Sequence, residues 1–231
     1  MKLLSINSDH KTVKGLKKGW LTGIMYLAPH TLGGFGTVCP KSTPGCRDSC
    51  LFTAGHGTYD RVRQARIART ALLRTDPDVF KLQLSEELTA LEKRAKRMGL
   101  KPCARLNGTS DLPWLGKYFA PRFPGIMFYD YTKIPRPWER ELPNYKITFS
   151  RSERNTCDCR AAIDNGINVA VVHGGYAPGA ISIGLYSQPL KFIFTINGDE
   201  NDLRFLDKRP RIILLKPKGR ARKDQTGFVV R

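Results

Sequence analysis

The sequence lacks any apolar run of the roughly 18 residues that a membrane span requires. Its longest apolar runs, such as residues 212–215, have only the length of a β-strand. The N-terminus also lacks the apolar core of a secretory signal, because Ser5, Asn7 and Asp9 interrupt it. We therefore expect a cytoplasmic protein that is not integral to a membrane.

Acidic residues are scarce. The 231 residues include 20 Asp and Glu against 39 Lys and Arg, which gives a formal net charge of +19. Eight cationic residues and no acidic one lie between Asp207 and Asp224. Such a run is usually a solvated surface, but together with the net charge it favours a polyanionic partner, most simply DNA or RNA. The candidate nucleic-acid-binding residues are Lys216, Lys218, Arg220, Arg222 and Lys223.

Internal repeats and low-complexity segments are also absent, and the composition, with 41% hydrophobic residues, is that of a folded domain. We predict one α/β domain over residues 1–231, with a basic polar segment at 1–19 and a basic C-terminal segment at 208–231. A helix is expected over residues 58–74, and a second over 77–98 with Asp76 as its cap.

Short apolar runs separated by loop-length or helix-length sequence predict strands. They span residues 20–28, 102–106, 125–129, 145–149, 167–172, 191–195 and 211–215. Strands alternating with such connections favour a parallel sheet. Seven strands in a chain of this length indicate an open or partial (β/α) barrel-like fold with a long cysteine-containing loop after the first strand.

Polar residues follow most of these strands. Since functional groups gather at the carboxyl ends of parallel strands, we expect a shared pocket there, although polar residues also simply begin loops. The catalytic candidates are Asp111, Asp130, Lys133, Arg151 and Asp199, and the cofactor-binding candidates are Asn107, Thr109 and Ser150.

Three cysteines in the loop after the first strand, Cys39, Cys46 and Cys50, have the spacing C-x6-C-x3-C. In a reducing compartment, clustered cysteines are more often metal ligands or catalytic thiols than disulfides. A 4Fe-4S cluster with one open iron fits this spacing. Zinc with His30 or His56 as a fourth ligand is an alternative, although the paired C-x2-C spacing is absent. The third possibility is small buried thiols without metal.

An acidic group at Asp199, Glu200, Asp202 and Asp207 stands out in so basic a chain. It is suited to a divalent cation, a general base or a ribose, and equally to turn formation and pairing with neighbouring cations. The sequence has no dinucleotide-binding glycine fingerprint, no phosphate-binding P-loop and no H-E-x-x-H motif.

Several motifs together resemble the gene-product-88-like family of phage and plasmid proteins. They lie at residues 23–29, 38–51, 105–111, 129–133, 149–153, 198–204 and 227–230. The resemblance implies a phage or plasmid origin in the bacterial cytoplasm. A looser similarity is to radical S-adenosylmethionine enzymes, which place three cluster cysteines after the first strand of a partial or full barrel.

The leading hypothesis is therefore a radical S-adenosylmethionine-like iron–sulfur protein acting on a nucleic acid or nucleotide. One alternative is a non-catalytic, zinc-stabilised nucleic-acid-binding protein. The other is a metal-dependent nuclease that uses Asp199 and Asp202.

Overall fold

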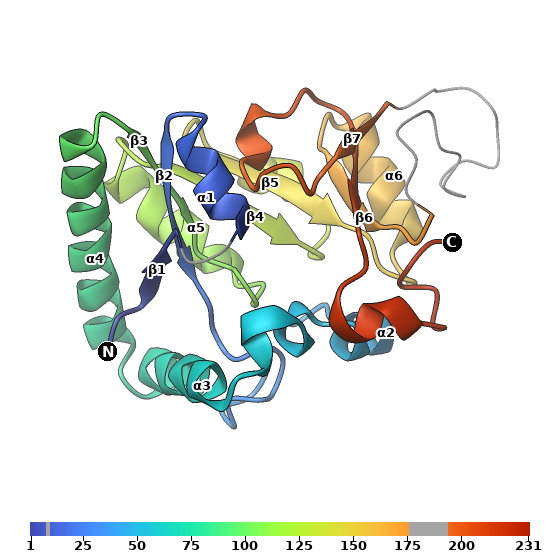
Figure 1. Cartoon of the computed structure of the whole chain (residues 1–231), viewed down its shortest axis with the longest axis horizontal. Coiled ribbons are helices and arrows are strands. Elements are labelled where there is room, and N and C mark those ends of the chain that lie inside the picture. The colour runs from blue at the N-terminus through green and yellow to red at the C-terminus, as the bar shows by residue number, and fades with distance from the viewer. Residues whose placement is uncertain (8–9, 176–193) are drawn as a thin grey trace.

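The computed structural model describes residues 1–7, 10–175 and 194–231. Within these residues, eight strands form one open sheet in the order β1-β2-β3-β4-β5-β6-β8-β7 (Figure 1). All neighbouring strands are parallel except β1, which runs antiparallel to β2. The predicted α/β class with an open, largely parallel sheet is therefore confirmed.

The strands are β1 (Leu4–Ile6), β2 (Trp20–Met25), β3 (Lys101–Arg105), β4 (Met127–Thr132), β5 (Tyr145–Ser150), β6 (Val169–Val172), β7 (Thr195–Asn197) and β8 (Ile212–Leu215). The helices are α1 (His10–Leu16), α2 (Pro44–Asp48), α3 (Asp60–Thr75), α4 (Pro77–Arg97), α5 (Pro113–Phe119) and α6 (Thr156–Asp164). Short 3-10 turns include η1 (Leu51–Thr53), η2 (Gly55–Thr58) and η6 (Gly219–Lys223). Among the described helices, none is long and apolar enough to cross a membrane.

Helix α4 forms where its sequence predicts. The Asp76 carboxylate accepts a hydrogen bond from the Val79 N–H at 3.1 Å, and Pro77 occupies the first helical position. Gly99 ends the helix with a positive φ of 65°. The stripe of apolar residues along the helix is fully buried: Phe80, Leu84, Leu88, Leu91 and Ala95. This stripe packs into the core that also holds the inner residues of β1 to β4.

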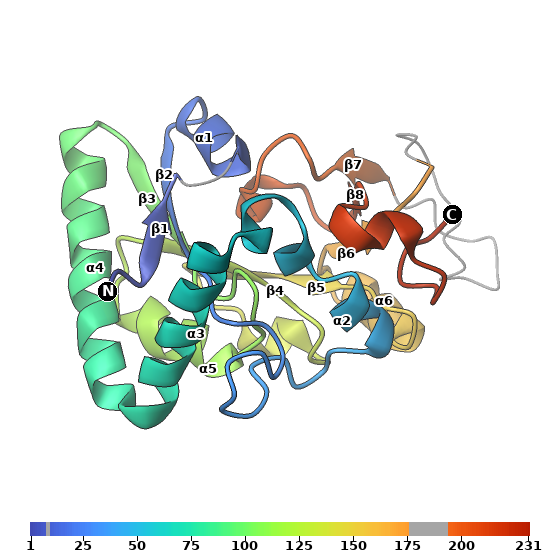
Figure 2. The ribbon, with the colours of Figure 1, turned by 60° about the horizontal axis from the view of Figure 1, so that its bottom comes forward.

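A second apolar cluster lies farther along the sheet, between α6 and the strands β5, β6 and β8. Its members include Phe149, Cys159, Ile163, Val169 and Leu214. The two clusters cover different halves of the sheet, and α4 and α6 lie at opposite ends of the molecule (Figures 1 and 2). The loop that carries Cys39, Cys46 and Cys50 lies below the sheet between these ends in Figure 1.

The structure adds two features that the sequence analysis did not predict, at the N-terminus and in the order of the last strands. The basic polar segment at 1–19 contains β1 and α1. The Glu87 carboxylate of α4 accepts hydrogen bonds from the Leu3 and Leu4 N–H groups and so holds the start of β1. Strand β8 lies between β6 and β7, an order that depends on contacts distant in sequence. The last predicted strand before it is reduced to Thr195–Asn197, and residues 191–193 lie outside the described residues.

Candidate functional site

A cavity of about 620 Å³ opens at the carboxyl ends of the parallel strands. Its wall receives side chains from the loops after β2, β3, β4, β7 and β8, and from the last residue of β5. Most predicted site residues line it: Cys39, Cys46, Cys50, Asn107, Thr109, Asp111, Lys133, Ser150, Asp199, Lys216 and Lys218. A cavity of this size accommodates a cofactor or substrate of nucleotide size.

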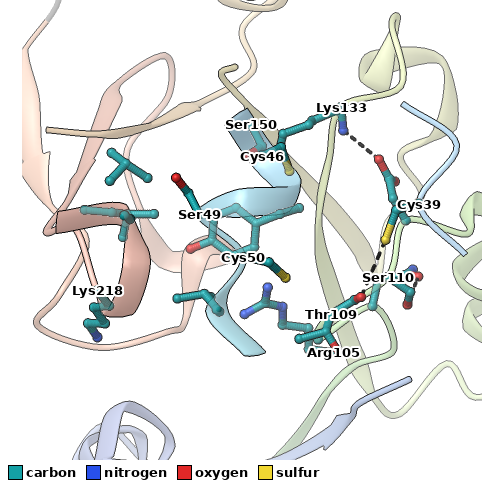
Figure 3. Close-up of a pocket in the computed structure, with 18 of the residues that line it drawn as sticks. Cys39, Cys46, Ser49, Cys50, Arg105, Thr109, Ser110, Lys133, Ser150 and Lys218 are labelled. Atoms are coloured by element: carbon teal, nitrogen blue, oxygen red, sulfur yellow. Dashed lines mark hydrogen bonds between the residues drawn. The ribbon is translucent and has the colours of Figure 1, made fainter. Parts of the chain in front are cut away.

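The three cysteines face this cavity from one loop. Cys39 follows β2, Cys46 lies in α2, and Cys50 follows α2. Figure 3 shows their side chains directed into the same space. Helix α2 begins after Thr43, whose hydroxyl oxygen accepts a hydrogen bond from the Cys46 N–H at 3.2 Å.

A carboxylate from another loop anchors the cysteine loop. The Glu153 side chain, from the loop after β5, accepts hydrogen bonds from the Thr43 hydroxyl at 2.8 Å and from the Gly45 N–H at 2.9 Å. Sequence reasoning did not select Glu153 as a site residue, because its partners lie more than 100 positions away. It positions α2, and therefore Cys46, against the sheet.

Burial keeps the thiols of Cys39 and Cys50 protonated in the metal-free protein. Burial raises the pKa of Cys39 to about 12, and it also raises the pKa of Cys50. The Cys39 sulfur lies 3.6 Å from the Thr109 carbonyl oxygen, to which the thiol donates. A thiol in this state is a poor nucleophile. Metal coordination would remove its proton.

Two buried cations lie near these sulfurs. The Lys133 ammonium donates to the Ser150 hydroxyl at 3.0 Å. Burial alone would lower the pKa of Lys133, but the neighbouring Cys46 and Asp111 raise it overall. Arg66 of α3 is only 7% exposed, and its guanidinium lies 5.1 Å from the centre of the Tyr26 ring. Its Nε and Nη1 atoms have no hydrogen-bond partner in the described part of the chain.

We tested whether this cysteine set suits a metal centre. Among the described residues, no three His, Cys, Asp or Glu side chains converge closely enough to hold a single metal ion. Neither His30 nor His56 lines the cavity. The His30 ring is hydrogen-bonded to the Thr31 hydroxyl, and the His56 ring stacks on Tyr59. In an iron–sulfur cluster each cysteine binds a different iron, so its ligands stand farther apart than those of one ion.

The opposite side of the cavity carries carboxylates that are already paired. Asp199 lies 2.8 Å from the Lys11 ammonium and 3.5 Å from that of Lys218, and it accepts the Lys216 N–H at 2.8 Å. Burial would raise the pKa of Asp199, but these partners lower it overall. Asp202 forms an ion pair with Arg105 at 3.2 Å and accepts the Tyr129 hydroxyl at 3.0 Å.

Other predicted site residues hold the strand-end loops together. Asp130 accepts hydrogen bonds from the Asn107 backbone N–H at 2.8 Å and side-chain amide at 3.0 Å, and it does not line the cavity. Burial raises its pKa to about 6. Asp111 accepts the Thr132 hydroxyl and the Lys133 N–H, both at 2.7 Å, and burial raises its pKa as well.

The predicted site residue Arg151 has a different position, and the Asn107–Thr109 turn is held by its glycine. Arg151 lies outside the cavity wall. Its guanidinium donates hydrogen bonds to the carbonyl oxygens of Gly227 and Phe228, at 2.8 and 3.0 Å, and so holds the C-terminal segment against the loop after β5. Gly108 lies so close to β2 that an added Cβ would stand 2.7 Å from the Met25 carbonyl oxygen. The turn carrying Asn107 and Thr109 is therefore packed against the sheet.

The basic C-terminal residues divide into two groups. Lys216 and Lys218 line the cavity, whereas Arg220, Arg222 and Lys223 are exposed in η6 beside it. Sequence reasoning missed Lys11, Arg105 and Tyr131 in the cavity wall. The local signal for Arg105 and Tyr131 is their place at or next to the last residue of a strand.

Comparisons with known proteins agree with the motif resemblance. A family model described as gene product 88 matches the chain over residues 1–231. The "Gene 88 protein" of Mycobacterium phage L5 is 25% identical over 163 residues, which cover 63% of this chain and 65% of the phage protein. The chain thus spans slightly less than two thirds of that relative's length. No solved structure matches the chain. Neither match supports the looser resemblance to radical S-adenosylmethionine enzymes.

Proposed function

The chain belongs to the gene product 88 family, and on that premise we propose that it is an iron–sulfur protein that binds a 4Fe-4S cluster through Cys39, Cys46 and Cys50. The observation that carries the proposal is that these cysteines, from one loop, line a single cavity over the carboxyl ends of parallel strands. In open parallel sheets, ligands bind at this edge.

The number of cysteines supports a reactive rather than a purely structural cluster. Three protein ligands leave one of four irons open, and the same cavity leaves room for a small molecule beside it. When bound, such a cluster supplies an open coordination position and an electron. The cavity offers polar atoms of Thr109, Ser110 and Ser150 to orient a ligand.

The charge around the cysteines supports an anionic centre. With a cluster bound, the three cysteines would be thiolates, and the half-buried Lys133 and the buried Arg66 would provide positive charge near them. Arg66 has two buried nitrogen atoms without hydrogen-bond partners among the described residues. Burial of an unpaired cation lowers the stability of a fold, so an anionic group bound beside Arg66 would relieve this cost. Arg105 adds a third cation in the cavity wall.

We further propose a radical S-adenosylmethionine-like reaction on a nucleic acid or nucleotide. The basic side chains of Lys216 and Lys218 in the cavity wall suit a phosphate-bearing substrate. Asp199 would orient these lysines, because it accepts the Lys216 N–H and pairs with Lys218. Lys133, which has a protonated ammonium at neutral pH, would hold a proton close to the bound ligand.

The first test is the metal content of protein purified without oxygen. Iron, sulfide and zinc per chain are measured for the native protein, for Cys46→Ala, and for Cys103→Ala as a matched control. Cys103 is a buried β3 cysteine that contacts the Thr22 hydroxyl and lies outside the cavity wall. We expect about four irons and four sulfides in the native protein and in the control, and their loss from Cys46→Ala. One zinc and no iron in the native protein would replace the proposal with the zinc-stabilised binding protein.

The second test concerns the ligand. The loaded protein is reduced without oxygen and given S-adenosylmethionine, and cleavage products are measured by chromatography. If the loaded protein neither binds nor cleaves S-adenosylmethionine, the radical reaction is refuted while the cluster remains.

A further inference from the structure

A strip of exposed aromatic and cationic residues borders the mouth of the cavity. It consists of residues 51–63, which include η1, η2 and the first turn of α3, and residues 218–223, which include η6. Leu51 in η1 is 54% exposed and lines the cavity itself. Tyr59, just before α3, is 60% exposed, and its ring stacks on the exposed His56 ring with centroids 5.5 Å apart.

Packing between distant segments makes this strip continuous. The Arg220 N–H donates to the Thr53 hydroxyl at 3.4 Å, which joins η6 to η1. Gly57 lies against η1, because an added Cβ would stand 2.6 Å from the Phe52 carbonyl oxygen. In both ribbon views the C-terminal η6 lies beside the segment that leads from η1 into α3 (Figures 1 and 2).

The strip is strongly basic. Its exposed or half-exposed cations are Arg61, Arg63, Lys218, Arg220, Arg222 and Lys223. Asp60 is the acidic residue within the strip, and it lies 3.8 Å from Arg63. Lys218 belongs to both the strip and the cavity, where Figure 3 shows it across from Cys39.

We propose that this strip binds single-stranded nucleic acid and directs one nucleotide into the cavity. The phosphates would pair with the cations of η6 and α3, and a base would stack on the His56–Tyr59 pair. Proteins that bind single strands combine a basic track with exposed aromatic faces in this way. A duplex offers no free base to stack, and enzymes that act on a base require it outside the duplex stack. Single-stranded nucleic acid would then be the substrate class of the proposed function. Binding of the strand does not depend on the cluster, whereas any reaction on the nucleotide in the cavity rests on the proposed function.

The test is binding of a fluorescent single strand of about 12 nucleotides, measured by anisotropy at several salt concentrations. We expect the native protein to bind the single strand more tightly than the matching duplex. Tyr59→Ala should weaken binding about tenfold, while Tyr59→Phe should bind like the native protein. Equal binding of duplex and single strand, or native affinity of Tyr59→Ala, would overturn the proposal.

Two triple variants that each remove three positive charges test whether the cations of the strip bind the phosphates. Lys218→Gln, Arg220→Gln and Arg222→Gln together should reduce the slope of log affinity against log salt by about 2. The control replaces Lys93, Lys96 and Arg97, exposed residues of α4 at the far end of the molecule, and should leave this slope close to native. Equal losses in both triples would refute the strip as the binding surface.

Iron content, measured on the same preparations, separates the two proposals. Native protein that binds the strand but contains no iron refutes the cluster alone. Native protein with a full cluster and no preference for single strands refutes this surface alone.

Discussion

The two sides of the cavity differ in how their ionisable groups are paired. On the cysteine side, the thiols of Cys39 and Cys50 are protonated by burial. Arg66, which does not itself line the cavity but acts on Cys50, has buried nitrogen atoms without partners in the described part of the chain. On the acidic side, Asp199 and Asp202 each pair with a cation, and of the Arg105 guanidinium only Nε is buried without a hydrogen-bond partner among the described residues. Buried groups that are already paired stabilise the fold. A buried polar group without a partner calls for an explanation, and an anion bound beside Arg66 is the explanation proposed above.

The largest expected effect on stability is on the acidic side. Asp202→Ala leaves Arg105 buried without its carboxylate and removes the acceptor of the Tyr129 hydroxyl. We expect the free energy of unfolding to fall by about 3–5 kcal/mol. Urea denaturation followed by circular dichroism measures it. Cys50→Ala serves as the comparison, and its free energy of unfolding should fall much less. Equal decreases in the two variants would contradict the claim that the paired acidic residues, and not the cysteines, stabilise the metal-free fold.

A pH-dependent effect of up to about 3 kcal/mol is expected at Asp130. Its pKa is raised from 3.8 to about 6 in the folded protein, so the folded state binds more protons between these values. The stability that Asp130 contributes is therefore present below pH 4 and is lost as the pH rises through 6. The side chain at position 130 in the variant Asp130→Asn cannot titrate. The free energy of unfolding of the native protein, relative to that of the variant, should therefore fall as the pH rises from about 4 to above 6. Urea denaturation at pH 4.5 and 7.5 measures the difference, and a constant difference would contradict the pKa shift.

Arg66 should have opposite effects on the metal-free and the loaded protein. Arg66→Met removes a buried charge whose Nε and Nη1 are unpaired among the described residues. We expect the metal-free protein to become more stable by about 1–2 kcal/mol. The loaded variant should lose its iron faster to a chelator, because a neighbouring positive charge is gone. Destabilisation of the metal-free protein with unchanged iron loss would show that Arg66 has a structural role only.

The smallest effect is expected at Asp199. Its partners Lys11 and Lys218 are partly exposed, so Asp199→Asn should lower the free energy of unfolding by no more than about 1 kcal/mol. Thermal denaturation at low and high salt measures this, and the loss should be smaller at high salt. If Asp199→Asn lowered the free energy of unfolding as much as Asp202→Ala, the expectation that Asp199 contributes less to stability than Asp202 would be wrong.

The sequence predicts those parts of the fold whose cause is local. Asp76, Pro77 and the apolar stripe specify α4 through capping and periodicity, and most strands have the apolar runs expected of a parallel sheet. Strand β1 has only three residues and depends on Glu87, more than 80 positions away. Local patterns do not contain that information.

In the candidate site, too, features with a local cause are predictable from the sequence, and features set by distant contacts are not. The cysteine spacing and the strand-end positions predict one cavity, and Cys39, Cys46 and Cys50 all line it. Asp130 instead holds the Asn107 loop, since the polarity of a strand-end residue does not reveal whether it faces the cavity or a neighbouring loop. Arg105 enters the site through its pairing with Asp202, 97 positions later in the chain.

The most direct test of the cluster is X-ray absorption at the iron and zinc edges of protein prepared without oxygen. The account predicts iron surrounded by sulfur with neighbouring iron atoms, in native protein and in Asp199→Asn, and no such signal in Cys39→Ala. Zinc with sulfur ligands, or no metal bound to any of these proteins, would contradict the assignment of the cysteine side as an iron–sulfur site.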